Sequence, residues 1–349
     1  MKSSERRATK NGVLSEAPES VKICLVNSIC FGELLVDMVS GAPDATLGEA
    51  ISFLKAPGGA PANVAVGLRR LGVASSFVGQ VGDDPFGFWL RDLVEREGVD
   101  VSQLAISAQA RTTIAFVATR SDGKKDICFY RNPGADAQFS AAQLATEFFS
   151  SARLFHCGSV SLSLEPCRSA QFEAARLARE AGALVSFDPN WRPSLWDDFD
   201  LARDLIWQMM PLCDVVKVAD EEWEFVTGTA DFEQGAAKIR ACGPKLVVIT
   251  RGSEGASFSC AGANGAVPGF ETEALDTLGA GDAFVAGLLF QLLQIGLETA
   301  LENGKIAEIL RFANACGALA TQQAGAIPAL PTWKEVEQFL AMRGVNSHS

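Results

Sequence analysis

The chain has 349 residues, 48% of them hydrophobic and 21% charged, and its formal net charge is −12. A chain of this length and apolar content can bury the core of one large α/β domain or of two smaller domains. The negative charge argues against general nucleic-acid or anionic-membrane binding, because phosphate groups would be repelled by the average field of the protein. It does not argue against ATP, since local amides, lysines and Mg²⁺ can supply positive potential.

The cysteines and histidines argue against several further kinds of functional site. The nine cysteines include no C-x-x-C pair and lie mostly in apolar runs, which predicts buried free thiols in a reducing compartment. His156 and His348 are the only histidines, so histidine-based metal sites and Ser-His-Asp triads are not expected. The sequence also lacks the P-loop, the G-x-G-x-x-G turn after a first strand and the G-x-S-x-G elbow. P-loop, dehydrogenase and serine-hydrolase functions are therefore excluded.

The first 21 residues predict a disordered leader. They combine basic residues with Glu5, Glu16 and Glu19 and lack the apolar core of a secretory signal. An organelle transit peptide is the alternative for this segment. The longest apolar run, Ala283–Phe290, contains a glycine and is too short to cross a bilayer. We therefore expect a cytoplasmic protein with no membrane partner.

Beyond the leader, short apolar runs alternate with longer amphipathic ones. The predicted strands are Ile23–Phe31, Ser75–Gly79, Leu154–Gly158, Leu184–Phe187, Val215–Val218 and Leu246–Thr250. The predicted helices are Pro61–Leu71, Gly87–Glu97, Pro166–Ala181, Leu201–Met210, Glu221–Val226, Phe232–Cys242, Asp282–Ile295 and Ala307–Gln323. This alternation predicts parallel strands with crossover helices on both faces, a doubly wound α/β sheet. We expect one domain over residues 22–340 and a flexible tail at 341–349.

Four strand-like segments interrupt this alternation, at residues 33–39, 51–55, 111–119 and 127–131. The last two flank Ser121-Asp122-Gly123, a sequence typical of a hairpin turn. The four segments do not fit a βαβ series. They predict a small antiparallel sheet that projects from the main domain as a lid, and an apolar face on such a sheet favours pairing with a second copy.

Residues 276–287, Asp-Thr-Leu-Gly-Ala-Gly-Asp-Ala-Phe-Val-Ala-Gly, form the most informative stretch. Gly279, Ala280 and Gly281 leave peptide N–H groups unobstructed at a helix start, where the helix dipole favours anions. Asp282 adds a carboxylate beside that site. Amides that hold a phosphate and a carboxylate that deprotonates a hydroxyl would together make a phosphoryl-transfer centre. Taken alone, the stretch could equally be a glycine turn with a capping aspartate.

A second glycine turn, Gly58-Gly59-Ala60-Pro61-Ala62-Asn63, opens the first predicted helix. Together the two turns resemble the paired signatures of the ribokinase-type (PfkB) carbohydrate kinase family, and the resemblance covers roughly residues 22–340. Within that family, Ala56–Ala65 and Phe129–Pro133 are most similar to fructokinases of the plant type.

The resemblance implies a ribokinase-like fold with a lid and an ATP-dependent transfer of phosphate to the 6-hydroxyl of D-fructose, giving fructose 6-phosphate. Asp282 would be the general base, and the amides of Gly279, Ala280 and Gly281 would be the anion hole. It further implies Mg²⁺ and K⁺, while the apolar face of the lid favours a homodimer formed through the lid. The alternatives are a kinase of the same family for ribose, 2-keto-3-deoxygluconate or a nucleoside, and a non-catalytic relative that acts as an interaction scaffold.

Candidate sugar contacts come from the first turn and the lid. Gly58 and Gly59 would allow close backbone approach, and Asn63 would offer an amide to hydroxyls. Asp37, at the end of an apolar strand, is either an acceptor for sugar hydroxyls or a solvated carboxylate. Two lid arginines, Arg131 and Arg111, are further candidates, and Arg131 is the stronger one. They would bind sugar oxygens or phosphate, or they would simply keep the lid soluble.

The carboxyl edge of the sheet carries another group of candidates, because open α/β sheets bind ligands there. Asn190 would orient phosphate or sugar, and Asp188 would belong to the Mg²⁺ network. Lys217 ends the next strand and would meet nucleotide phosphates. Glu222 resembles the glutamate of the family's Asn-x-x-Glu motif, an outer-shell Mg²⁺ ligand, although Ala219 stands at the asparagine position.

The nucleotide would lie on the turn that contains Thr250, Gly252 and Gly255, with Thr277 near its phosphates. Asn314 is similar to an adenine-side contact of the family and could equally be a helix-packing amide. The resemblance also implies a monovalent-cation site whose ligands include backbone carbonyls: Asp276, Leu278, Ala320 and Gly325. For the last two, simple helix termination before Pro328 is the alternative.

Overall fold

The computed structural model describes residues 24–42, 44–119 and 125–344. The predicted leader at 1–21, the Asp122-Gly123 turn and most of the predicted tail lie outside the described residues. The strands are β1 Cys24–Phe31, β2 Leu35–Ser40, β3 Phe53–Gly58, β4 Val73–Gly82, β5 Asp100–Ser107, β6 Ile114–Thr119, β7 Lys125–Tyr130, β8 Ala152–Cys157, β9 Leu184–Phe187, β10 Val215–Ala219, β11 Leu246–Thr250, β12 Gly255–Cys260 and β13 Ala263–Pro268. The helices are α1 Ala60–Arg70, α2 Pro85–Arg96, α3 Thr146–Phe149, α4 Cys167–Glu180, α5 Phe199–Met209, α6 Asp220–Thr227, α7 Phe232–Ala241, α8 Ala280–Ile295, α9 Leu297–Glu302, α10 Ile306–Ala320, α11 Ala326–Ala329 and α12 Trp333–Met342.

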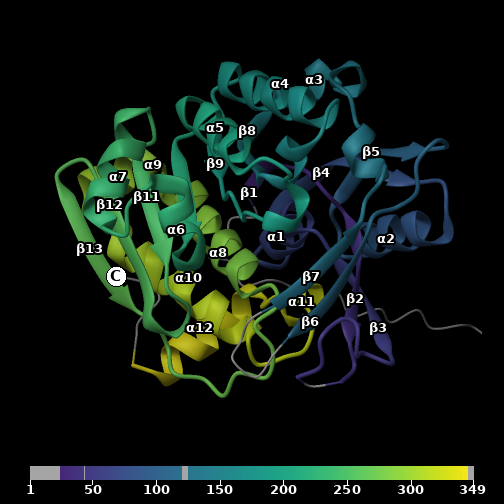
Figure 1. Cartoon of the computed structure of the whole chain (residues 1–349). Helices are drawn as coiled ribbons and strands as arrows, with labels where there is room; N and C mark the ends of the chain where they lie inside the picture. The colour runs from purple at the N-terminus through teal and green to yellow at the C-terminus, as the bar shows by residue number, and fades with distance from the viewer. Residues whose placement is uncertain (1–23, 43, 120–124, 345–349) are drawn as a thin grey trace, which may run out of the picture.

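A large sheet runs through the molecule in the order β13-β12-β11-β10-β9-β8-β1-β4-β5 (Figure 1). All neighbours from β11 to β5 are parallel, and β12 and β13 add an antiparallel edge. Helices cover both faces, so the central strands are apolar on both sides. One core packs α4, α5, α6 and α7 against the sheet, and the other packs α1, α2, α8, α10 and α12 against the opposite face. This arrangement confirms the predicted doubly wound fold.

The lid is a smaller sheet with the order β3-β2-β6-β7. β2 and β3 form one antiparallel pair and β6 and β7 another, while β2 and β6 pair in parallel and join them. The four predicted lid segments are all present. β2, β3 and β6 begin two or three residues later than expected, whereas β7 begins two residues earlier and ends one residue earlier. As a result Arg111 lies before β6 and Arg131 lies just after β7, so both occupy the hinges of the lid rather than its strands.

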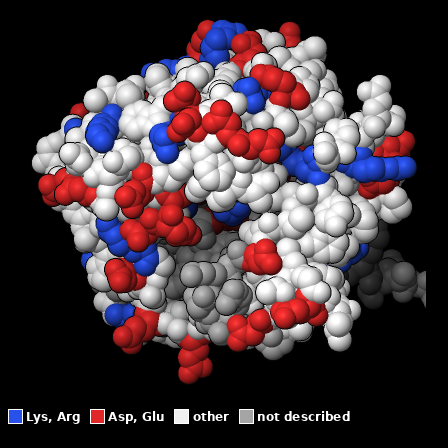
Figure 2. Space-filling model, in the orientation of Figure 1, with Lys and Arg blue, Asp and Glu red and all other residues white. Residues whose placement is uncertain are grey.

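The described residues also show the state of the cysteines, the apolarity of the helices and the distribution of charge. The cysteines whose side chains are described are free, and only Cys128 and Cys242 among them are exposed. Among the helices that the structure describes, none has the length and apolarity needed to span a membrane. Described acidic and basic side chains are interspersed over the face in Figure 2, which shows no broad basic surface for a polyanion.

Candidate active site

The two glycine turns meet at the carboxyl end of the large sheet. The Asn63 Nδ2 atom, on α1, donates a hydrogen bond of 2.8 Å to the Asp282 Oδ2 atom, on α8. α1 and α8 pack along each other, which keeps these side chains at facing helix starts. Residues 219 positions apart in the chain therefore form one site.

Asp282 lies in the first turn of α8 and is partly exposed. Burial raises the pKa of its carboxyl to about 6, and the Asp188 charge acts in the same direction. The Asn63 hydrogen bond and the positive charges of Lys217 and Arg192 oppose this shift. A carboxyl with a pKa near 6 is ionised at neutral pH but is a stronger base than an ordinary aspartate.

The start of α8 is shaped to receive an anion. Gly279 adopts a left-handed conformation with φ 79°, and a Cβ there would lie 2.8 Å from Ala326, so the position requires glycine. No side chain caps the first N–H groups of α8. A Cβ on the exposed Gly281 would lie 3.7 Å from the Lys217 ammonium, which puts a positive charge beside these amides. Peptide dipoles and a lysine thus favour a phosphate at the same place.

Lys217 is held by a buried ion pair. Its Nζ lies 3.0 Å from the Asp188 Oδ2 atom, and both side chains are buried. Burial lowers the pKa of the Lys217 ammonium, but the charges of Asp188, Glu222 and Asp282 outweigh burial and leave it raised. The lysine therefore stays charged. The other Asp188 oxygen, Oδ1, is buried without a hydrogen-bond partner, and an unpaired carboxylate oxygen of this kind fits a water or Mg²⁺ ligand.

Glu222 fastens the loop that follows β9. Its Oε2 accepts a hydrogen bond of 2.5 Å from the Trp191 N–H, and its Oε1 accepts one of 2.9 Å from the Ala219 N–H. Burial raises the pKa of the Glu222 carboxyl to about 7. Asn190, directly before Trp191, has a positive φ of 45°. These two hydrogen bonds of Glu222 thus hold the backbone next to Asn190.

On the sugar side, Asp37 of β2 faces the first glycine turn. It is buried rather than solvated, and a Cβ on Gly58 would overlap its carboxylate. A Cβ on Gly59, which has φ 111°, would overlap the carbonyl group of Glu33. Both glycines are therefore required by close approach.

The two lid arginines differ. The Arg131 Nε atom lies 2.7 Å from Asp136 Oδ2, its Nη1 donates to Ser163 Oγ at 2.7 Å, and the side chain is buried. The Arg111 side chain is exposed, and the hydrogen bond it makes among the described residues is a long one, 3.4 Å, from Nη1 to the Asp83 carbonyl. Both line a cavity of about 380 Å³ at the base of the lid. Arg131 is held in one position and Arg111 is not.

The segments predicted to hold a monovalent cation are adjacent. Asp276 Oδ1 accepts from the Leu278 N–H at 2.9 Å, and Asp276 Oδ2 accepts from the Gly325 N–H at 2.8 Å. The Leu275 and Asp276 N–H groups both donate to the Thr321 carbonyl, one residue after Ala320. Within the described part of the chain, no group of three or more His, Cys, Asp or Glu side chains could hold a metal. A cation between these two segments would need backbone carbonyl oxygens, as the resemblance implies.

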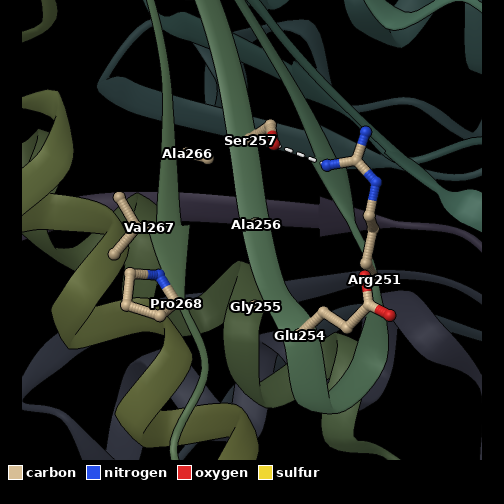
Figure 3. Close-up of a pocket in the computed structure, with 8 residues that line it drawn as sticks. All are labelled: Arg251, Glu254, Gly255, Ala256, Ser257, Ala266, Val267 and Pro268. Atoms are coloured by element: carbon tan, nitrogen blue, oxygen red, sulfur yellow. Dashed lines mark hydrogen bonds between the residues drawn. The ribbon is translucent and has the colours of Figure 1, made fainter.

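The predicted nucleotide turn follows β11. Gly252 and Gly255 have φ of 53° and 98°, Thr250 ends the strand, and Thr277 is exposed beside the α8 turn. A cavity of about 280 Å³ lies at this turn, between the Arg251 side chain and the β13 residues Val267 and Pro268 (Figure 3). Asn314 of α10 donates to the carbonyls of both β13 residues, at 3.2 and 3.0 Å. Its amide nitrogen thus joins a helix to the sheet, as the packing alternative predicts.

Comparison with known proteins decides the family. A sequence profile for the pfkB family carbohydrate kinases matches residues 27–333. The chain belongs to the PfkB family.

Fructokinases are prominent among the similar proteins. Fructokinase-1 of Zea mays is 44% identical over 313 residues, which is 89% of this chain and 97% of that protein. The crystal structure of a Xylella fastidiosa fructokinase with bound ATP superimposes with a TM-score of 0.83 at 36% identity, covering 91% of this chain and 99% of that one. A Vibrio cholerae fructokinase, bound to fructose, ADP and calcium, gives 0.81 at 34% identity, covering 90% and 99%.

Sequence reasoning did not single out three charged residues that lie beside the predicted site residues. Arg192 influences the pKa of Asp282, and its place in the loop after β9 is a signal that could have found it. Glu33 and Asp136 lie at the hinges of the lid, and both are buried. Glu33 directly follows Gly32 at the end of the first predicted strand, which is a usable signal. Asp136 lies in a short 3₁₀ turn that shows no periodic pattern.

Proposed function

We propose that this chain transfers the γ-phosphoryl group of ATP to the 6-hydroxyl of D-fructose and releases fructose 6-phosphate and ADP. The names of the relatives support fructose as the acceptor. The observation that carries the proposal is the hydrogen bond between Asn63, of the sugar-side turn, and Asp282, of the phosphate-side turn.

In the proposed reaction, Asp282 removes the proton of the 6-hydroxyl as that oxygen bonds to phosphorus. A sugar hydroxyl is far too weak an acid to ionise alone at neutral pH, so a positioned carboxylate must take the proton. The amides of Gly279, Ala280 and Gly281, with the Lys217 ammonium, stabilise the charge on the transferred group. Asp37, Asn63 and Arg131 orient the sugar.

The donor is ATP with Mg²⁺, which neutralises phosphate charge when bound. Asp188, with its unpaired buried oxygen, is the residue that would face the metal or its waters, and Glu222 would act at one remove through the loop that it holds. We also propose K⁺ between the Asp276 and Gly325 segments, where it would fix the start of α8.

We propose a homodimer formed through the lid and a cytoplasmic location. The lid exposes the large apolar side chain of Leu54, at 71%, which a second lid would cover. One relative, fructokinase-6 of Arabidopsis thaliana, is chloroplastic, so an organelle is the alternative location. Sedimentation of the wild type and of Leu54→Lys tests the dimer, because a lysine at a buried interface should yield monomers.

The deciding experiment measures ATP consumption by the purified protein with fructose, ribose, adenosine and 2-keto-3-deoxygluconate. We expect the highest kcat/KM with fructose, and phosphorus NMR of the product should place phosphate on carbon 6. A higher kcat/KM with a riboside would favour a nucleoside substrate, since an aminoimidazole riboside kinase superimposes with a TM-score of 0.78. No acceptor-dependent turnover at all would favour the scaffold.

A further inference from the structure

The lid touches the main domain along helix α2 as well as at its hinges. α2 packs on β4 and β5 of the large sheet, and its buried residues include Leu90 and Val94. It also lies beside β2 of the lid (Figure 1). The partly buried side chains of Met38, from β2, and of Phe86 and Trp89, from α2, pack against the same core. α2 therefore contacts both sheets.

Lys55 of β3 lies over the aromatic rings of α2. Its Nζ atom is 3.7 Å from the centroid of the Trp89 ring and 5.9 Å from that of the Phe86 ring. An ammonium group at this distance is attracted by the negative face of an aromatic ring, most strongly by an indole. β3 leads directly into the Gly58-Gly59 turn. The Lys55 contact thus joins a lid strand that borders the proposed sugar site to the main domain.

Lys55 and Asp37, which is proposed to bind the sugar, lie on opposite faces of the same pair of strands. Lys55 is opposite Met38 in the β2–β3 pairing, and Met38 directly follows Asp37. Neighbouring side chains of a strand point to opposite faces of the sheet. Met38 accordingly packs against the main core, whereas Asp37 faces Gly58, where an added Cβ would overlap its carboxylate. A shift of β3 relative to α2 would therefore displace Asp37 as well.

The start of α2 is also tied to the lid hinge before β6. Asp84, the N-cap residue of α2, accepts hydrogen bonds from the N–H groups of Phe86 and Gly87, at 3.0 and 2.9 Å. Its Oδ2 atom accepts another, of 2.8 Å, from the Thr112 N–H of that hinge. Among the described residues β3 is the edge strand of the lid, and β2 is its one hydrogen-bonded neighbour. α2 thus holds a hinge of the lid through Asp84 and its β3 edge through Lys55.

We propose that Lys55 is a positioning residue of the acceptor site: its ammonium group, held over the Trp89 ring, fixes the β3 edge of the lid to α2 and thereby keeps Asp37 in place for the sugar. The inference rests on the proposed sugar-kinase function. Because Lys55 is exposed, this contact can be removed without opening the core. Molecules whose lid edge is detached bind sugar weakly, so the apparent sugar affinity follows the attached fraction.

The kinetic test compares Lys55→Met with wild type in turnover of fructose and ATP. Methionine keeps an unbranched side chain but removes the charge. We expect KM for fructose to rise about 3- to 10-fold, while kcat and KM for ATP stay within about twofold of wild type. Lys55→Arg keeps a cation over the ring and should hold KM for fructose within about twofold of wild type.

Arg91→Met is the matched control. Arg91 also places a cation over an aromatic ring of α2, with its guanidinium carbon 5.4 Å from the centroid of the Phe88 ring. Its ion pair with Asp92 likewise lies within α2. The control should leave KM for fructose within about twofold of wild type. If it raises that KM about threefold or more, the effect comes from α2 itself and the proposal is wrong.

Fluorine NMR of protein labelled with 5-fluorotryptophan tests the contact without relying on turnover. The chain has six tryptophans, and the signal of Trp89 is the one that Trp89→Phe lacks. Lys55→Met should move this signal, whereas Arg91→Met should not. An unmoved Trp89 signal in Lys55→Met would show that Lys55 does not lie over the ring, and the proposal fails. Fructose turnover by wild type tests the proposed function separately, so the two failures are distinguishable.

Other kinetic results also overturn the proposal. A rise in KM for fructose of less than about threefold in Lys55→Met, or the same rise in Lys55→Arg, would mean that the cation does not position the lid. A fall in KM would mean that the contact holds the lid away from the sugar. In a Trp89→Leu background Lys55→Met should raise KM little further, and fully additive effects contradict the proposal. If Lys55→Met does not fold, Lys55→Gln takes its place.

Discussion

In the proposed site, the groups assigned to the phosphate are peptide N–H groups at the start of α8, whereas those assigned to the sugar are side chains from several separate segments. The phosphate side needs little more than a left-handed glycine and an uncapped helix start. The proposed sugar side needs Asn63 and Arg131 to be held by partners distant in the chain, Asp282 and Ser163. A phosphate is recognised by charge and shape that many backbones can supply, while a particular sugar is recognised by individual hydrogen bonds. The first side should therefore be sensitive to backbone changes, and the second to the loss of single side-chain atoms.

The largest effect is expected where the two sides meet. Asp282→Asn keeps the shape of the side chain but removes its basicity, so kcat should fall by at least about 10²-fold. Affinity for ATP, measured by calorimetry, should stay within about threefold. Wild-type turnover by the Asp282→Asn variant would show that another group accepts the proton.

Gly279→Ala tests the backbone of the phosphate side. The added Cβ would lie 2.8 Å from Ala326 and force a left-handed alanine, so the first turn of α8 must shift. We expect kcat/KM for ATP to fall about 10-fold or more while fructose affinity changes little. Gly182→Ala is the control, because Gly182 also has a left-handed φ, 80°, but no atom lies within 4 Å of the new Cβ. It should cost about 1 kcal/mol of stability and leave turnover unchanged.

The pH dependence of kcat tests how Asn63 serves Asp282. Because burial raises the pKa of Asp282 to about 6 and the base must be ionised, kcat should rise with pH through about 6 and then level off. Asn63→Ala removes a hydrogen bond that lowers this pKa, so the rising limb should move to higher pH. An unchanged midpoint would mean that the limb does not report Asp282.

The smallest effect on catalysis is expected at Asn314. Asn314→Ala removes two hydrogen bonds to β13 and should lower the free energy of unfolding by about 1–3 kcal/mol, measured in urea. KM for ATP should change less than about threefold. The opposite pattern, a large rise in KM with normal stability, would make Asn314 a nucleotide contact.

The predicted strands match the structure best at the centre of the large sheet. Central strands such as β8, β10 and β11 are covered on both faces and read as apolar runs, so their positions were predicted closely. Three strands toward the ends of the sheet were missed. β5 has alternating exposed residues, β13 contains a glycine and little apolar sequence, and β12 is buried throughout but begins at Gly255 of the glycine turn. The parallel pairing of β2 with β6 was also missed, because register between distant segments leaves no local pattern.

The candidate site residues could be predicted only where their signal is local in the sequence. Glycine turns are local signals, so the start of α8 and the Gly58-Gly59 turn were found from sequence. Glu33 accepts a hydrogen bond from a residue 27 positions away, and Glu222 accepts one from a residue 31 positions away. Such contacts depend on tertiary packing, which residue types alone do not encode.

The parallel pairing of β2 with β6 links the strand that carries Asp37 to the β6–β7 hairpin, which Arg131 follows. Asp37 lies opposite Ala115 in β6, and β6 is hydrogen-bonded to β7, which ends beside Arg131. The segments β2–β3 and β6–β7, which α1, β4, α2 and β5 separate in the chain, therefore form one sheet. A ligand that moves one of these two segments must also move the other. The contacts that the lid makes with the sugar should therefore form or break together.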